Sequence, residues 1–255
     1  MGAFITVRTI DQVHFAGDSI TGFNWFSAPG GIVAQMNASL ATLPKTSYPG
    51  VLAGGAVAAT LAGGATVAVN RPVYQVPPFV TAPTLKPVTS AGFSGNSITD
   101  FVANVPARIT NYNPDVLFLE TGANDEQNFN NSALTVPQYI TATTSVINQC
   151  LTFNPNMKIC ILAALCLSEN WNAGPTWALS VRTMLPNLQT ICAGYPNVVC
   201  ADINTPALAY EVANNAPSPG AHDGILTNPG DGVHPSPTGQ ALMGTWTMPY
   251  LQFSY

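Results

Sequence analysis

The strongest constraint on the fold is an alternation of short apolar runs with stretches whose apolar residues recur at helical spacing. Strands separated by helices pair in parallel through right-handed crossovers, so the alternation predicts a three-layer α/β/α architecture with one parallel sheet. The runs with the composition of buried strands are Val13–Ala16, Val88–Ala91, Val116–Leu119, Ile159–Leu167 and Val198–Ile203.

The helical stretches carry start and stop signals. Thr135 and Gln138 form the Thr-x-x-Gln pattern of a capping box, and the dipeptide Ser236-Pro237 is typical of a helix start. Pro106 interrupts a predicted helix over residues 101–109, and Pro186 interrupts another over residues 181–192. In the first crossover Ile32, Val33, Met36, Leu40 and Leu43 recur at helical spacing. We therefore expect one helix in each predicted crossover and one after the last strand.

Residues 44–86 depart from this alternation. They are rich in Gly, Pro, Ala, Val and Thr, and they are too many for an ordinary connection between a helix and a strand. We expect an insertion with some β-structure that lies over one edge of the sheet. A role in subunit contact is equally open, and the oligomeric state is not predicted. The rest of residues 1–255 fits a single domain.

Charged residues are scarce, and this limits the classes of partner. Only 7% of the 255 residues are charged, against about 25% in an average soluble domain. Seven basic residues and a net charge of −5 argue against binding to nucleic acid. A surface wetted by Asn, Thr, Ser and Gln suits an extracellular or particle-associated protein.

No apolar run has the character of a transmembrane segment. The most apolar stretch, residues 51–69, consists of Ala, Gly, Thr and Val and lacks the Leu, Ile and Phe of a spanning helix. The N-terminus has no basic region followed by an apolar one, so the prior removal of a leader or an upstream module stays open.

The five cysteines have no metal-type spacing. Cys160, Cys166 and Cys200 lie in or beside apolar runs, where a buried free thiol acts as a small hydrophobic residue. A structural disulfide, with Cys150–Cys192 among the pairs it could use, is the alternative. The sequence does not determine the disulfide status.

A serine follows the first predicted strand, in Gly17-Asp18-Ser19. In an open parallel sheet, ligands bind outside the carboxyl ends of the strands. A serine at such a turn can expose its hydroxyl, which becomes a nucleophile when a base takes its proton. The alternative is that Ser19 or Thr21 caps the next helix.

A candidate base lies near the C-terminus, in the segment Asp231-Gly232-Val233-His234-Pro235. A histidine that accepts a serine proton needs its other ring nitrogen held by an acceptor, and an aspartate three residues earlier can reach it. An Asp-Gly turn with a helix-capping histidine is the alternative for Asp231 and His234. His222-Asp223 is a rival pair, and His14 fits a packed core histidine.

Two further loops offer hydrogen-bond donors for an oxyanion. Gly95, in the segment Gly-Phe-Ser-Gly, can bring its backbone close to a substrate because it has no side chain. Asn124, in Gly-Ala-Asn-Asp, offers a neutral amide. Either feature alone is common in loops. Preorganised donors of this kind are worth about 3 kcal/mol each to a tetrahedral transition state.

Taken together, the four segments GDSIT, GFSG, GAND and DGVHP resemble the four sequence blocks of the SGNH (GDSL-type) hydrolases, in the family's order. The resemblance runs from about Val13 to the last predicted helix, without residues 44–86. It implies a flavodoxin-like sandwich with strand order 2-1-3-4-5. It also implies Ser19 as nucleophile, Asp231 and His234 as its partners, and an oxyanion hole of Ser19, Gly95 and Asn124. Ser90 stands where the second block often has Asn, which puts a loop-bracing hydrogen bond in doubt.

The implied reaction is acyl transfer to water through an acyl-enzyme, without a cofactor or a metal. Family members include lipases, thioesterases, arylesterases and carbohydrate acetylesterases. Trp25, Phe129 and Trp171 fall beyond strand ends, where they could contact a sugar or an acyl group, with core packing as the alternative. We expect short-chain, acetyl ester hydrolysis on a small ester or an acetylated carbohydrate. A longer-chain lipase or arylesterase and a non-catalytic carbohydrate-binding or tail module are the alternatives.

Overall fold

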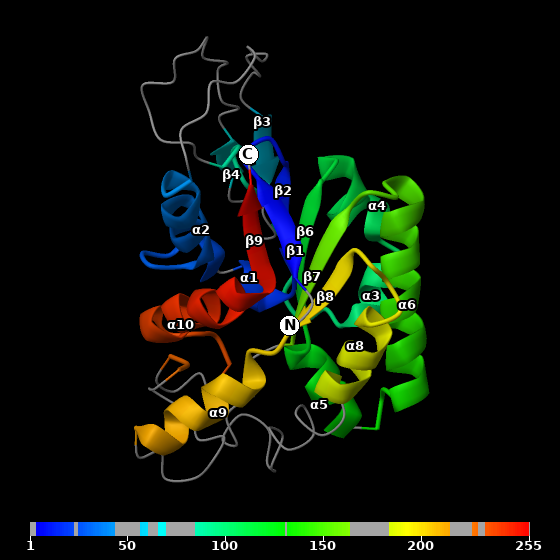
Figure 1. The fold of residues 1–255 in the computed structure, drawn as a ribbon. Helices are drawn as coiled ribbons and strands as arrows, with labels where there is room; N and C mark the ends of the chain where they lie inside the picture. The colour runs from blue at the N-terminus through cyan, green and yellow to red at the C-terminus, as the bar shows by residue number, and fades with distance from the viewer. Residues whose placement is uncertain are drawn as a thin grey trace.

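A computed structural model of the chain describes residues 4–22, 25–43, 57–60, 66–69, 85–130, 132–163, 184–214, 226–228 and 233–254. Its centre is a five-stranded sheet in the order β5-β2-β6-β7-β8, and every neighbouring pair is parallel (Figure 1). The strands are Thr89–Gly92 (β5), Val13–Gly17 (β2), Val116–Thr121 (β6), Lys158–Ala163 (β7) and Val198–Ala201 (β8). Numbered along the chain, this order is 2-1-3-4-5, so the predicted fold is confirmed.

Alternate residues of the strands supply the two cores of the sandwich. Phe15, Phe118, Cys160 and Val199 lie in register across four strands and belong to one buried cluster. Their neighbours Ala16, Leu119 and Ile161 belong to the second cluster on the opposite face. Because side chains alternate along a strand, a sheet that is buried on both faces needs apolar residues at every position. This is why β6, β7 and β8 consist mostly of apolar residues, whereas the edge strand β5 is Thr-Ser-Ala-Gly.

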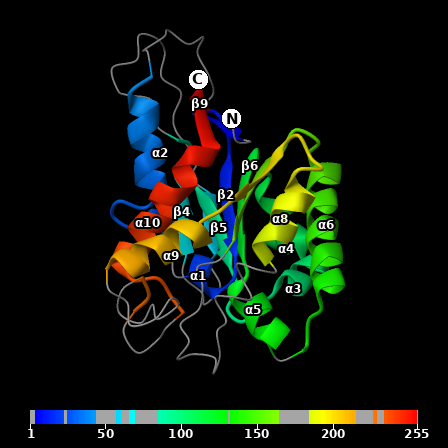
Figure 2. The same ribbon diagram turned by 60° about the horizontal axis from the view of Figure 1, so that its bottom comes forward.

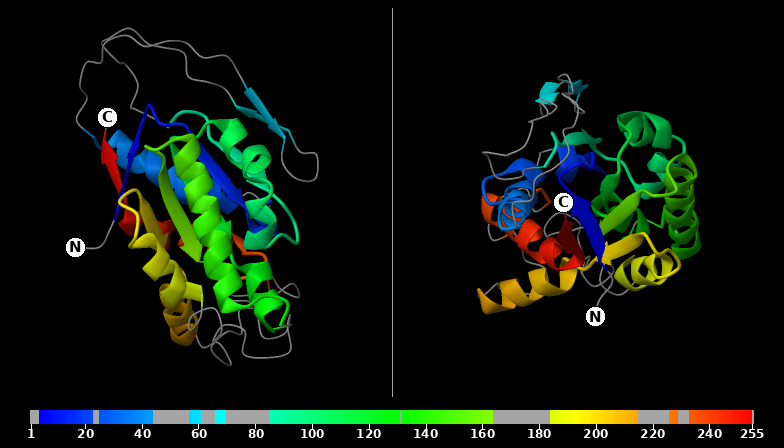
Figure 3. Two further views of the ribbon diagram at one scale, coloured as in Figure 1. Left: turned by 90° about the vertical axis from the view of Figure 1, so that its right-hand side faces the viewer. Right: turned by 45° about the horizontal axis from the view of Figure 1, so that its top comes forward.

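Helices cover both faces of the sheet (Figures 2 and 3). The first face packs against α1 (Ser19–Gly22), α2 (Ile32–Ala41), α9 (Asn204–Ala213) and α10 (Pro237–Thr247). The second face packs against α3 (Ile98–Val102), α4 (Val105–Arg108), α6 (Val136–Phe153) and α8 (Leu185–Cys192). Short 3-10 turns at Trp25–Ser27, Thr110–Tyr112 and Met248–Tyr250 join some of these elements.

The helix boundaries follow the local signals in the sequence. Thr135 and Gln138 form the expected capping box at the start of α6, and the Ser236 side chain accepts a hydrogen bond from the Gly239 N–H at the start of α10. Pro106 divides the predicted helix over 101–109 into α3 and α4, because proline lies in the first turn of α4 and cannot continue a helix. Pro186 likewise lies in the first turn of α8.

Some elements were not predicted from the sequence. β1 (Ile5–Arg8) and β9 (Leu251–Ser254) form a separate parallel pair that joins the two ends of the described chain (Figure 1). α5 (Ala123–Asn130) begins where we expected a loop, and α9 lies after β8. β1 and β9 are short, and they lie at opposite ends of the sequence. Their pairing therefore depends on the tertiary structure.

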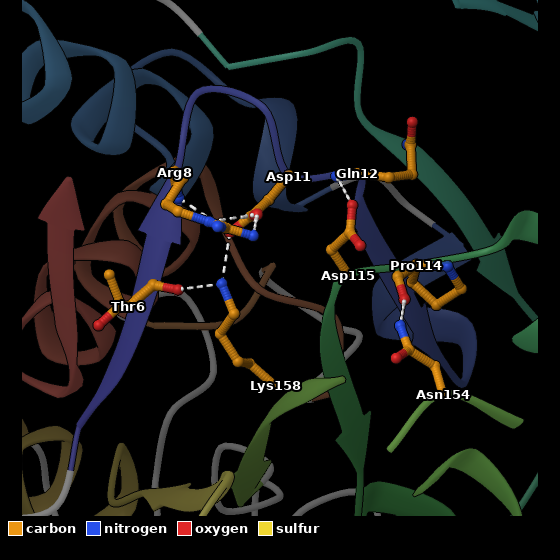
Figure 4. A network of polar contacts seen from close by, with 8 residues as sticks. All are labelled: Thr6, Arg8, Asp11, Gln12, Pro114, Asp115, Asn154 and Lys158. Atoms are coloured by element: carbon orange, nitrogen blue, oxygen red, sulfur yellow. Dashed lines mark hydrogen bonds and ion pairs between the residues drawn. The ribbon is translucent and has the colours of Figure 1, made fainter. Parts of the chain in front are cut away.

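A polar network attaches β1 to the beginning of β7 (Figure 4). The Asp11 carboxylate is fully buried and lies 2.6 Å from Lys158 Nζ and 2.8 Å from an Arg8 guanidinium nitrogen. Lys158 Nζ also donates to the Thr6 carbonyl oxygen at 2.7 Å. One buried carboxylate thus fixes the turn after β1 to the first residue of β7.

Within residues 44–86, the described strands are β3 (Val57–Thr60) and β4 (Thr66–Val69), which form an antiparallel hairpin. β3 contacts β5, the edge strand of the central sheet. This agrees with the expectation of β-structure near one sheet edge. The hairpin is drawn in cyan in Figure 3.

The described cysteines Cys150, Cys160, Cys192 and Cys200 are free thiols, so the alternative of a Cys150–Cys192 disulfide is not realised in this structure. Cys166 lies outside the described residues. None of the helices in the described ranges is both long and apolar enough to cross a membrane.

We expect Asp11→Ala to lower the free energy of unfolding by about 3 kcal/mol, because removal of one partner leaves the largely buried Lys158 ammonium uncompensated. Arg8→Ala is the matched control. The Arg8 side chain is 41% exposed, so its loss should cost about 1 kcal/mol or less. Urea unfolding of both variants measures this difference, and equal losses would contradict the assignment of Lys158 as the partner that matters.

Candidate active site

The register of the central sheet brings three loops together. Gly17, the last residue of β2, is paired with Gly92 on one side and with Glu120 on the other. The loops that follow β2, β5 and β6 therefore leave the sheet at the same level. They carry the GDSIT, GFSG and GAND segments, so the parallel register alone places three of the four predicted blocks side by side.

Two of the paired residues must be glycine. A Cβ at Gly92 would overlap the backbone of Gly22, because α1 passes directly against the end of β5. A Cβ at Gly17 would overlap the Thr21 side chain and the Glu120 carbonyl oxygen. The close approach of these backbones positions the turn that begins α1. Ser19 is the first residue of that helix.

Ser19 and His234 meet at this edge of the sheet. The Ser19 Oγ lies 3.0 Å from His234 Nε2, although the two residues are 215 positions apart. Ser19 is 9% exposed, and His234 is half-buried. The segment that holds His234 is fixed by a hydrogen bond from the Asn228 N–H to the His234 carbonyl oxygen, 2.9 Å long. A hydroxyl this close to an imidazole can transfer its proton to the ring.

The other members of the C-terminal prediction lie outside the described residues. These are Asp231 and the rival pair His222 and Asp223. His14 is a buried core histidine, as predicted. Its Nδ1 lies 2.9 Å from Thr89 Oγ1 and its Nε2 lies 2.8 Å from the Arg108 carbonyl oxygen. Burial lowers the pKa of His14 to about 4.

The predicted oxyanion donors lie on the neighbouring loops. Gly95 has a φ of +75°, which favours glycine, and the space where a Cβ would stand is open. Asn124 lies in the first turn of α5. Its Nδ2 donates to the Asn96 carbonyl oxygen at 3.0 Å and to Asp18 Oδ2 at 3.3 Å. The amide of Asn124 therefore bridges two of the three loops.

A set of buried carboxyl groups in and beside the GDSIT and GAND segments was not predicted from the sequence. Asp18, Glu120 and Asp125 are each at most 1% exposed. Desolvation raises the pKa of Asp18 to about 6, against the lowering effect of the Ile20 N–H bond. Desolvation and the nearby Asp18 charge raise the pKa of Glu120 well above its ordinary value. Glu120 directly follows the apolar run Val116–Leu119 in a chain with few charged residues. This position was the sequence signal that could have identified it as a buried carboxyl group.

Asp125 joins the GAND and GFSG loops. Both of its carboxylate oxygens accept from the Ile98 N–H, at 3.0 and 3.1 Å, at the start of α3. Desolvation raises the pKa of Asp125 to about 7. The side chain thus fixes the loop that carries Gly95 against the helix that carries Asn124.

The aromatic residues predicted beside the substrate lie in different environments. Trp25 has no exposed surface and packs edge-on against Phe15 and Phe26, with ring centroids 5.8 and 6.4 Å away. The core-packing alternative therefore describes Trp25, because α2 and the sheet enclose the ring. Phe129 is partly buried on α5 and packs against Tyr139. Trp171 lies outside the described residues.

Sequence comparison identifies the family. The profile of the GDSL-like lipase/acylhydrolase family matches residues 15–242, which is most of the chain. The protein belongs to this family, and it is accordingly a hydrolase of the esterase type. Sequence comparison with curated proteins finds no match.

Solved structures share the fold at low sequence identity. An acetyl xylan esterase, AlAXEase, is 20% identical, with a TM-score of 0.58 over 94% of this chain and 97% of its own. The acetylxylan esterase Axe2 from Geobacillus stearothermophilus is 16% identical, with a TM-score of 0.60 over 96% and 95%. A lipase/acylhydrolase from Enterococcus faecalis is 15% identical, with a TM-score of 0.55 over 93% of each chain.

The raised pKa of Asp125 predicts an unusual pH dependence of stability. The folded protein binds the Asp125 proton more tightly than the unfolded chain does. The free energy of unfolding should therefore fall as pH rises from about 4 to about 7, by up to about 1.4 kcal/mol per pH unit from this group. Asp125→Asn keeps an acceptor for the Ile98 N–H and removes the titration. Urea unfolding of both proteins across this range measures the effect, and a pH-independent difference would contradict it.

Proposed function

We propose that the protein is a serine esterase that hydrolyses acetyl and other short acyl esters, with acetylated carbohydrate as its substrate class. The observation that carries the proposal is the 3.0 Å contact between Ser19 Oγ and His234 Nε2. In this assignment Ser19 is the nucleophile and His234 is the general base. Asp231 holds the second ring nitrogen of His234.

The reaction proceeds in two steps. His234 takes the Ser19 proton as Oγ attacks the ester carbonyl carbon. The tetrahedral intermediate then collapses as His234 returns the proton to the leaving alcohol. In the second step His234 deprotonates a water molecule, which attacks the acyl carbon. His234 then returns the proton to Ser19 Oγ as the bond to the acyl group breaks and the carboxylic acid leaves. The backbone N–H groups of Ser19 and Gly95 and the Asn124 amide stabilise the oxyanion.

The Geobacillus enzyme supports this assignment of roles. Its solved structures include catalytic mutants in which a serine, an aspartate or a histidine is replaced by alanine, and the aspartate precedes the histidine by three positions. Asp231 and His234 have the same spacing. The acetylxylan esterases among the similar structures also support an acetylated carbohydrate as substrate.

The described surface beside Ser19 favours a short acyl group. The exposed residues of the loop after β5 are Ser94 and Gly95, with Asn96 beside them. The Phe93 ring stacks on the Arg108 guanidinium, 4.3 Å from its centroid, and is thereby fixed. A long acyl chain needs a continuous aliphatic lining, because each buried CH₂ is worth about 0.8 kcal/mol. Small and polar groups here fit an acetyl group and sugar hydroxyls better. The sparse charge of the chain supports an enzyme that acts outside the cell or on a particle.

We expect Ser19→Ala and His234→Ala each to lower kcat by at least about 10³-fold, because the two side chains act as one unit. The double variant should be little worse than either single variant. His222→Ala is the matched control and should remain active. Hydrolysis of p-nitrophenyl acetate by proteins of verified folding measures this. Loss of activity in His222→Ala, with His234→Ala active, would assign the base to His222.

The acyl preference is tested with p-nitrophenyl esters from acetyl to palmitoyl. We expect kcat/KM to be highest for acetyl or propionyl and to fall by at least about tenfold at octanoyl, because the described residues beside Ser19 offer added CH₂ groups no aliphatic lining. Release of acetate from acetylated xylan, compared with chemically deacetylated xylan, tests the carbohydrate. An optimum at eight carbons or beyond would favour the lipase alternative. The similarity to the Enterococcus lipase/acylhydrolase is the observation that supports this alternative.

A further inference from the structure

Glu120 is paired with Gly17 in the sheet, two residues before Ser19, and has one oxygen without a donor. Its Oε2 accepts a hydrogen bond from Thr21 Oγ1 at 3.2 Å. Its Oε1 is buried and accepts no hydrogen bond from a donor of the described residues, and the residue is 1% exposed. An ionised carboxylate with an unsatisfied oxygen in such a place is costly, so the arrangement favours a protonated Glu120.

The acceptor for that proton is Asp18. The carboxyl groups of Asp18 and Glu120 are close enough for each to affect the pKa of the other, and a proton between them would join them. Asp18 already accepts from the Ile20 N–H at 2.8 Å and from Asn124 Nδ2 at 3.3 Å. Two buried carboxyl groups in contact cannot both ionise, so they share one proton. Asp18 has N–H donors for both of its oxygens, and Glu120 is therefore the member that carries the proton.

This proton affects the oxyanion donor. One amide hydrogen of Asn124 is committed to the Asn96 carbonyl oxygen at 3.0 Å. The other is directed at Asp18 Oδ2 over 3.3 Å, which is long for an N–H···O bond. It is also the hydrogen that the proposed oxyanion hole requires. A fully charged Asp18 without the Glu120 donor would bind this hydrogen more strongly and withdraw it from substrate.

We propose that Glu120 is a positioning residue that acts through Asp18 on Asn124. By donating its proton to Asp18, Glu120 weakens the hold of Asp18 on the Asn124 amide and leaves one N–H available to the oxyanion. Glu120 itself contacts no reacting atom. The inference rests on the proposed function, because it concerns the oxyanion hole of that reaction.

The charged groups around the pair give the sign of the pH effect. His234 faces Asp18 and favours its negative charge, whereas Asp125 repels it. Thr21 is the neutral contact of Glu120. When the shared proton is lost at higher pH, Asp18 carries a full charge without its donor. It then competes for the Asn124 amide, so kcat should fall as pH rises.

The test compares Glu120→Ala with Glu120→Gln, whose amide can donate to Asp18 and accept from Thr21. We expect Glu120→Ala to lower kcat on p-nitrophenyl acetate by about 10–10²-fold with KM changed by less than about threefold, since an oxyanion donor acts in the transition state. Glu120→Gln should restore most of this loss. It should also lack the fall in kcat at alkaline pH that the natural protein shows.

A double-variant cycle tests the route through Asn124. Asn124→Ala alone should lower kcat by about 10²–10³-fold, and Glu120→Ala should add little in that background. Leu119→Ala, on the same strand but in the opposite core, is the matched control for loss of packing. It should leave the pH profile of kcat unchanged at temperatures where circular dichroism reports a folded protein.

Several outcomes would overturn the inference. They are additive losses in the cycle, an effect of Glu120→Ala confined to KM, and a Glu120→Gln profile that matches the natural protein at alkaline pH. If Glu120→Ala does not fold, the pH profile of Glu120→Gln decides by itself. Absence of esterase activity in the natural protein would contradict the proposed function instead, so the two failures are distinguishable.

Discussion

The site depends on the parallel register at the carboxyl ends of β2, β5 and β6. Gly17 lies between Gly92 and Glu120, and the absence of a side chain at both glycines lets α1 approach the end of β5. A larger residue at either position would overlap neighbouring backbone atoms. The turn that presents Ser19 would then move, and the loops with Gly95 and Asn124 would no longer face it. The positions of the site side chains thus depend on close packing of the backbone at Gly17 and Gly92.

Buried carboxyl groups hold these loops together at an electrostatic cost. Asp125 binds the N-terminus of α3, and Asp18 binds the turn of Ser19 and the amide of Asn124. Charge in such an environment is unfavourable, and the pKa of each group is raised for this reason. The proposed oxyanion hole needs fixed dipoles around the developing negative charge. The protein stabilises that arrangement through its two large apolar cores, which offset the cost of burying polar groups.

Much of the fold followed from local sequence. The apolar runs gave the strands of the central sheet, because a sheet covered on both faces requires apolar residues throughout. Thr135, Gln138 and Ser236 marked helix starts through side-chain caps, and Pro106 marked a helix boundary. The pairing of β1 with β9 was not predicted, because residues at opposite ends of a chain carry no local signal of contact. α5 was missed because its sequence, ANDEQNFN, has no apolar stripe.

The sequence by itself indicated Ser19, His234, Gly95 and Asn124 as candidates, and the resemblance of its four segments to the SGNH hydrolases implied the family and the order of the central strands. These predictions depend on short segments that can be recognised from the amino-acid sequence. Only the tertiary structure decided that Ser19 Oγ and His234 Nε2 are in contact, that Trp25 is a core residue, and that Glu120 lies against Asp18. The physical reason is that distance, burial and protonation depend on neighbours contributed by remote parts of the chain. The apolar run before Glu120 does not reveal which side chain the Glu120 carboxyl group will contact.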